Sequence, residues 1–236
     1  YLITVVSVLF SYLFYLLIPL LYDKTWVQTN IEKKLFNEFK INLSASADIS
    51  YRILPAPHFL IKDSKILLRN TKNNQSIADV KNLKVFVSQK NLFDKDKMNL
   101  KRVIINKANF LFLRSDLKIL NESSNNQFSN KQIIIDDSSI FFKDNAEEII
   151  TIVKINKANL FFDNEKKINL FKLKGEVFAV PFIFNFKNKN SFIKNKQINF
   201  EAKSLMLNIF NESIKDKDSS FSGKNTISFL NSTINT

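Results

Sequence analysis

The stretches Asn106–Phe112, NKANFLF, and Asn156–Phe162, NKANLFF, are nearly the same heptapeptide, and they decide the fold class of this chain. Each belongs to a longer pattern: Ile, two polar residues, a small residue, a polar residue and then three apolar residues. The copies begin at Ile105 (INKANFLF), at Ile155 (INKANLFF) and, in weaker form, at Ile135 (IDDSSIFF) and Ile61 (IKDSKILL). Because near-identical heptapeptides in one chain are not accidental, the pattern indicates a repeated structural unit.

Alternate side chains share one face of a β-strand. In the first copy this places Ala108, Phe110 and Phe112 together, with Lys107 and Asn109 on the opposite face. The equivalent apolar sets in the other copies are Ser138, Ile140 and Phe142; Ala158, Leu160 and Phe162; and Ser64, Ile66 and Leu68. The repeat therefore predicts strands with one small-then-bulky apolar face and one polar face.

A strand with one apolar face needs something to cover it. The cover can be a second sheet or a helix, as in a sandwich. The alternative is a sheet curled into a trough whose apolar face holds acyl chains. Periodicity alone leaves both structures open and slightly favours the sandwich.

Further short apolar runs, separated by Asn, Lys, Asp and Ser, continue from Ile41 to the end of the chain. They predict an all-β, antiparallel body. Two polar stretches, Asn121–Asn130 and Asn211–Lys224, are predicted to be loops. The runs that predict strands are FLIKDSKILL, LKVFVS, RVIINKANFLFL, QIIIDDSSIFF, KINKANLFF, FIFNF and INFEAKSLMLNIF.

Residues 1–22 carry no charge and predict a membrane span. A helix of this length covers about 33 Å, against a hydrocarbon core of about 30 Å. Secretory signal peptides have shorter apolar cores and a small-residue cleavage site, and the following residues, DKTWVQTN, offer no such site. We therefore expect an uncleaved signal anchor, with Tyr22 and Trp26 at the membrane interface. The lysines that follow mildly favour a cytoplasmic body by the positive-inside rule, so charge does not settle the orientation.

Residues 23–40 predict a short amphipathic helix that covers the end of the core behind it. Thr25 and Gln28 have capping-box spacing. Apolar residues then recur every four positions, at Val27, Ile31, Leu35 and Phe39. Residues 41–236 would form the β body.

Composition argues against catalysis. The chain has no Cys and one His, His58, which excludes thiolate and two-histidine metal sites; His58 is expected to face solvent or lie in a loop. Motifs of hydrolases, nucleotide-binding loops and zinc proteases are lacking. The net charge of +13 is spread along the chain without a basic block, so we expect a lysine-rich surface and no nucleic-acid binding. We expect no enzyme, metal or cofactor.

The order of several parts resembles the N-terminal region of AsmA-family proteins. A membrane anchor is followed by ADISYRILPAPHFLIKDSKILL, SIADVKNLKVFVSQKNLF and LKRVIINKANFLFL. The family's Pro-x-Pro element, A-x-x-x-x-L strand and Leu-Phe turn match Pro55 and Pro57, Ala78 and Leu83, and Leu92 and Phe93. The resemblance covers residues 1 to about 170. The family's glycines before the first strands are absent here.

The resemblance implies a single-pass protein of the inner membrane of Gram-negative bacteria, with its β body in the periplasm. The elongated antiparallel sheet would curl into a taco-like groove. That groove would assist phospholipid transport between inner and outer membrane and outer-membrane assembly. The expected partners are phospholipid acyl chains, the inner membrane, and periplasmic or outer-membrane proteins. The expected lining residues are Ser64, Ile66, Leu68, Ala108, Phe110, Phe112, Ile140, Phe142, Ala158, Leu160 and Phe162.

The chain is short for a bridge across the periplasm, so we expect a small member of the family or an N-terminal fragment, and the polar ending favours a fragment. The competing hypothesis is a membrane-tethered β-sandwich that acts as a scaffold or interaction module without lipid cargo.

Overall fold

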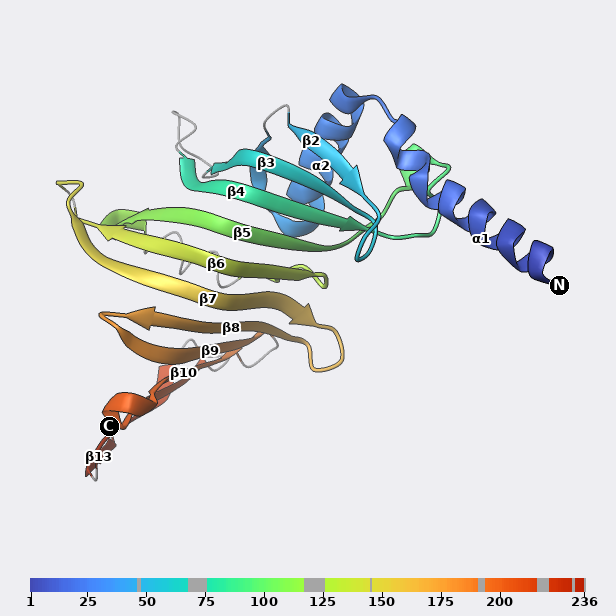
Figure 1. The fold of residues 1–236 in the computed structure, drawn as a ribbon. Coiled ribbons are helices and arrows are strands. Elements are labelled where there is room, and N and C mark those ends of the chain that lie inside the picture. The colour runs from blue at the N-terminus through green and yellow to red at the C-terminus, as the bar shows by residue number, and fades with distance from the viewer. Residues whose placement is uncertain are drawn as a thin grey trace. The chain divides into compact units, whose positions relative to one another are not determined.

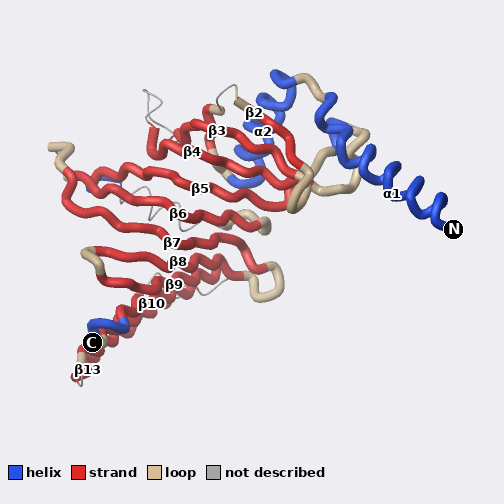
Figure 2. Tube along the Cα trace, in the orientation of Figure 1, coloured by secondary structure: helices blue, strands red, loops and turns tan. Residues whose placement is uncertain are grey.

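The computed structural model of the chain describes residues 1–45, 48–67, 76–116, 126–144, 146–190, 194–215, 221–230 and 232–235. The chain forms two compact units, Tyr1–Ile105 (unit 1) and Asn106–Thr236 (unit 2). Unit 2 is built mainly of strands, whereas unit 1 combines strands with two long helices (Figures 1 and 2).

Unit 1 begins with helix α1 (Leu2–Leu17), which continues into the 3-10 turn η1 (Ile18–Leu21). Together they are 20 residues long, with mean hydropathy 2.2, which is long and apolar enough to cross a membrane. The prediction of one apolar N-terminal helix is confirmed.

Helix α2 (Lys24–Phe39) follows. Its N-cap is Asp23, whose carboxylate accepts a hydrogen bond from the Trp26 N–H at 2.8 Å. The helix lies within the predicted residues 23–40, but Thr25, which has capping-box spacing with Gln28, is inside the first turn and is not the N-cap. The helix ends at Phe39, and its C-cap, Lys40, has a left-handed backbone conformation.

The strands of unit 1 are β1 (Asn42–Ser44), β2 (Ile49–Arg52), β3 (His58–Leu67), β4 (Ser76–Val87) and the first part of β5 (Leu100–Leu113). Strand β3 is central and pairs antiparallel with β1, β2 and β4. The β4–β5 connection contains the short 3-10 helix η2 (Lys95–Lys97).

The core of unit 1 lies between α2 and this sheet (Figure 1). The four apolar residues predicted for the inner face of the helix, Val27, Ile31, Leu35 and Phe39, are all buried. On the strands, Ile61 and Leu83 are fully buried. In unit 1, therefore, a helix covers one face of the sheet.

In unit 2, strands β6 to β13 form an open antiparallel sheet in which each strand pairs with the next one along the chain, and β5 lies next to β6. The described helices of unit 2 are η3 (Arg114–Asp116) and η4 (Lys203–Leu205). Its strands are the rest of β5, β6 (Gln132–Lys143), β7 (Ile149–Asp163), β8 (Ile168–Val177), β9 (Val180–Asn190), β10 (Lys194–Ala202), β11 (Leu207–Lys215), β12 (Phe221–Phe229) and β13 (Ser232–Asn235).

The expected fold class, mainly β and antiparallel behind an N-terminal apolar helix, is confirmed. The predicted loop Asn211–Lys224 was wrong at both ends, because β11 extends to Lys215 and β12 begins at Phe221; residues 216–220 lie outside the described part of the chain. The run INFEAKSLMLNIF is two strands joined by η4. The sheet of unit 2 is open. Its curling into a taco-like groove belongs to the functional proposal below.

The repeat encodes an irregularity within each strand. The third residue of three copies has positive φ: Asp63 (49°), Lys107 (57°) and Asp137 (46°). In the fourth copy, the pairing of β7 with β8 shifts by one residue at Asn156. In each copy the Ile before the irregularity and the small residue after it are both on the inner side; Ile61 with Ser64, and Ile155 with Ala158, are buried pairs. A regular strand would place such residues on opposite faces, so the irregularity keeps both inside.

Candidate functional site

One face of unit 2 carries a row of apolar side chains that crosses eight strands. We call it the central row. Its members are paired across neighbouring strands: Ile135, Ala158, Leu173, Phe184, Phe200, Ile209, Ile227 and Ile234. At about 4.8 Å between strands, the row extends over roughly 34 Å.

A second row lies beside the central row on the same face, two residues away from it on each strand. It consists of Ile133, Leu160, Phe171, Phe186 and Ile198, and it ends in polar residues, Asn211 and Asn225, on the last strands. A ring contact connects the two rows, because the Phe171 and Phe184 centroids are 5.8 Å apart; on the other side of the central row, Phe182 of β9 stacks on Phe200 of β10 at 5.2 Å. The two rows and the residues joined to them below form the apolar face.

Strand β5 joins this face through β6. The Ala108 N–H donates to the Ser138 hydroxyl at 3.0 Å, and the Ser138 hydroxyl donates to the Asp136 carbonyl at 2.8 Å. The Phe112 ring lies 6.4 Å from Phe110 and 6.2 Å from Phe142. Ser138 thus connects β5 and β6 next to the backbone irregularity of the repeat, and the phenylalanines beyond it form one aromatic cluster.

The opposite face of unit 2 is rich in lysine. Lys157 and Lys174 are cross-strand neighbours, and both are exposed, as are Lys172 and Lys187. This face is interrupted by the half-buried pair Phe161 and Leu170.

In the central row, Ala158 and Leu173 are buried, Ile227 and Ile234 are exposed, and the other members are half-buried. The contrast between the two faces identifies the apolar one as the candidate site, because contiguous apolar surface that reaches solvent marks binding sites.

Hydrogen bonds attach the segment before β6 to β7 and β8 at one end of the apolar face. The side chain of Asn169 on β8 is buried and binds the segment before β6 twice: its amide donates to the Asn126 carbonyl at 2.7 Å, and its oxygen accepts from the Phe128 N–H at 2.9 Å. The Phe162 N–H donates to the Ser129 carbonyl at 2.7 Å. Residues 126–130 belong to the stretch expected to be a loop; residues 121–125 lie outside the described part of the chain.

Among the residues predicted to line a groove, Ala108, Phe110, Phe112, Ile140, Phe142, Ala158, Leu160 and Phe162 lie on the apolar face of unit 2. Ser64 and Ile66 are buried in unit 1. Leu68 lies outside the described residues.

Sequence reasoning missed much of the apolar face. Its members on β8, β9 and β10 do not follow the repeat, so the heptapeptide could not identify them. Alternating apolar residues in INLFKLKGEV (Ile168–Val177) were the available signal for β8.

The single histidine is not exposed. His58 is 2% exposed, stacks on Phe86 at 4.9 Å, and its Nδ1 lies 2.8 Å from the Ala56 carbonyl oxygen. Burial lowers the pKa of His58. The expectation of a solvent-facing or loop histidine was wrong, because the strand after Pro57 begins one residue earlier than the apolar run suggests. Among the described residues, no cluster of His, Asp and Glu could hold a metal ion.

No protein-family model matches this chain, and no curated protein sequence matches it.

Proposed function

We propose that the protein is a membrane-anchored lipid-binding protein whose apolar face in unit 2 holds phospholipid acyl chains. The central row carries the proposal. It is continuous over eight strands, and its last members, Ile227 and Ile234, are exposed on strands near one end of the sheet. Its half-buried and exposed side chains lose further contact with water when an apolar occupant covers them, which is favourable.

Acyl chains fit the chemistry of the face. Their methylene groups need no hydrogen-bond partners, and each one removed from water contributes about 0.8 kcal/mol. A dozen methylenes therefore supply enough free energy for binding without any specific polar contact.

The N-terminal helix supports a membrane location. The Leu2–Leu21 segment is long and apolar enough to span a bilayer, and most of its side chains up to Phe14 are exposed. The resemblance to AsmA-family proteins extends the proposal: this is a single-pass inner-membrane protein of Gram-negative bacteria, whose periplasmic body curls around phospholipids and assists their passage towards the outer membrane.

The competing hypothesis, a closed sandwich used as a scaffold, requires a second layer over the apolar face. Among the described residues of unit 2, helices η3 and η4 have three residues each, and the strands follow one another in a single ladder. The observed arrangement of unit 2 favours a face open to a ligand.

The test is to place a carboxylate on the face with Phe112→Asp. A charge desolvated among acyl chains costs several kcal/mol, so we expect lipid binding to be lost. The matched control is Asn109→Asp, which places the same carboxylate on the exposed, opposite face of β5. Native mass spectrometry for bound phospholipid and uptake of a fluorescent phospholipid measure occupancy, while circular dichroism checks the fold.

If the face is open, Phe112→Asp stays folded and loses lipid while Asn109→Asp keeps both properties. If the face is the core of a sandwich, Phe112→Asp unfolds the unit, and Phe112→Ala costs about 3–5 kcal/mol. A folded Phe112→Asp variant that takes up lipid as well as the parent protein would refute the proposal.

A further inference from the structure

The loop between β4 and β5 in unit 1 is fastened to the membrane helix. Tyr15 Oη on α1 donates to the Gln89 carbonyl at 2.6 Å and accepts from the Leu92 N–H at 3.2 Å. Tyr12 Oη donates to the Gln89 side chain at 3.2 Å. Tyr22, just after η1, donates to the Leu92 carbonyl. Three tyrosines spaced along the apolar N-terminal segment thus hold one loop.

The tip of this loop is apolar and exposed. Phe93 is 75% exposed although its ring lies 5.2 Å from Tyr15. Leu54, in the β2–β3 loop, is also exposed, and that loop lies at the same end of the sheet, because the Val87 N–H donates to the Pro57 carbonyl at 3.1 Å. Leu20 and Leu21 of η1 add further exposed apolar surface.

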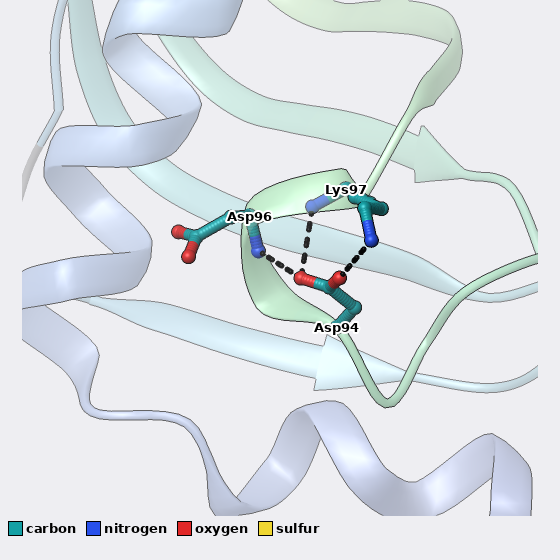
Figure 3. Close-up of polar contacts among 3 residues, drawn as sticks. All are labelled: Asp94, Asp96 and Lys97. Atoms are coloured by element: carbon teal, nitrogen blue, oxygen red, sulfur yellow. Dashed lines mark hydrogen bonds and ion pairs between the residues drawn. The ribbon is translucent and has the colours of Figure 1, made fainter.

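The loop is stiffened from within, so the exposed Phe93 is held in place. The Asp94 carboxylate accepts from the Asp96 N–H at 3.2 Å and the Lys97 N–H at 3.4 Å, and it pairs with Lys97 Nζ at 2.9 Å (Figure 3). The hydrogen bond from Lys97 lowers the pKa of Asp94. On the other side of the loop, Lys95 Nζ lies 5.3 Å from the Trp26 ring, which contacts Tyr22 edge-on at 5.5 Å.

Helix geometry places this loop either within the bilayer or at its interface. From Leu2 to Phe14, where most side chains are exposed, α1 rises only about 18 Å, which is shorter than a hydrocarbon core of about 30 Å. If the bilayer also contains the residues up to Leu21, then Tyr12, Tyr15 and the loop bound to them lie in contact with lipid. If the bilayer contains only the residues up to Phe14, the same tyrosines and loop lie at the interface, where aromatic side chains are favoured.

We infer that the β4–β5 loop is a membrane-docking element: Phe93 inserts into the bilayer interface beside α1, with Leu54 and Leu20 next to it, and seats unit 1 directly on the lipid surface. The exposed Lys90 and Lys95 meet the phosphate groups of the headgroups there. The inference rests on the proposed anchoring of α1 in a membrane. It assigns a second contact with the bilayer, made by the folded unit itself.

The absence of cysteine allows a direct test. Single substitutions Val8→Cys, Phe93→Cys and Asp79→Cys, each labelled with an environment-sensitive fluorophore, are compared in the full chain reconstituted into phosphatidylcholine–phosphatidylglycerol vesicles. Val8 is an exposed residue of α1. Asp79 is exposed on β4 but lies about 26 Å along the strand from Val87, next to the loop, at roughly 3.3 Å per residue. Nitroxides attached to the lipid chains serve as quenchers.

We expect Phe93→Cys to be quenched about threefold more strongly than Asp79→Cys and to approach Val8→Cys, because inserted apolar side chains lie at the depth of the upper acyl chains. Adding Tyr15→Phe, which removes two hydrogen bonds to the loop, should reduce quenching at position 93 and leave position 8 unchanged. Quenching at position 8 with none at position 93 overturns the docking inference and leaves the anchor standing. Quenching at neither position overturns both.

Discussion

Gly175 shows how one residue can decide the packing of the apolar face. It lies on β8 opposite Ile155, beside the point where β7 carries its extra residue, Asn156. A Cβ at this position would be 2.4 Å from the Lys154 carbonyl oxygen and 3.2 Å from the Phe182 ring. Backbone and an aromatic ring of the face therefore occupy the space that any other side chain needs.

We predict that Gly175→Ala destabilises unit 2 by about 1–3 kcal/mol, because a backbone contact this close cannot be relieved by rotating a side chain. Urea unfolding monitored by circular dichroism measures the change. The control is Gly223→Ala on exposed β12, where the nearest atom to a new Cβ is 3.1 Å away, and we expect a smaller effect. Equal stability of Gly175→Ala and the parent protein would show that β7 is not packed against β8 in this register.

At the scale of single residues, alternation predicted which repeat residues lie on the apolar face and which lysines lie outside. It placed Ala108 with Phe110, and Lys107 opposite them, and burial agrees with both. It could not predict that Ile155 lies on the same side as Ala158, because a three-residue separation changes sides in a regular strand. Only the backbone conformation, which depends on the neighbouring strands, shows the irregularity that brings both residues to the same side.

At the scale of the element, each repeat is a strand with a kink at a fixed place. Asp137 has a φ of 46° and lies between Asp136, paired with Lys157, and Ser138, paired with Ile155. The kink in β6 thus lies beside Asn156, the irregular residue of β7. Kinks in adjacent strands line up across the sheet, and local bends of this kind let a sheet curve.

We predict that Asp137→Gly stabilises the protein by up to about 1 kcal/mol, because glycine adopts positive φ without the steric cost paid by other residues. Ser139→Gly, two residues further along the same strand, should instead destabilise it by roughly 0.5–1 kcal/mol, since glycine weakens a regular strand. Thermal or urea unfolding of both variants gives the comparison. Destabilisation of similar size in both would mean that position 137 has an ordinary strand conformation.

Elements were predictable where the local pattern is strong. Helix α2 and the strands that carry the repeat follow from periodicity and composition. Strands β12 and β13 were not predicted, because FSGKNTISF and STIN are mostly polar and acquire strand structure only by pairing with β11 and with each other. A helix covers the sheet of unit 1, whereas the described helices of unit 2 have three residues each. The sequence of a single strand does not predict whether a helix will pack against it.

At the scale of the whole molecule, the proposed lipid binding rests on two properties that act in different ways. The net charge of +13 draws anionic surfaces over a distance set by salt. The apolar face of unit 2 acts only on contact and by removing hydrocarbon from water. A protein that merely adsorbs to anionic membranes depends on the first property, whereas one that holds acyl chains depends on the second.

We therefore predict that uptake of a zwitterionic phospholipid changes by less than about twofold between roughly 0.05 and 0.5 M salt, because burial of acyl chains involves no exposed ion pair. Adsorption of the same protein to anionic vesicles should fall by about tenfold or more over that range, as charges beyond the shrinking Debye length are screened. Uptake is followed with a fluorescent phospholipid and adsorption by vesicle sedimentation, both with the full chain diluted below the critical micelle concentration of the detergent so that the vesicles stay intact. Phe112→Asp should abolish the first measurement and leave the second nearly unchanged, since one charge in a net +13 alters the long-range attraction little. Loss of uptake in parallel with adsorption as salt rises would mean that lipid is held by the lysine-rich surface and not by the apolar face.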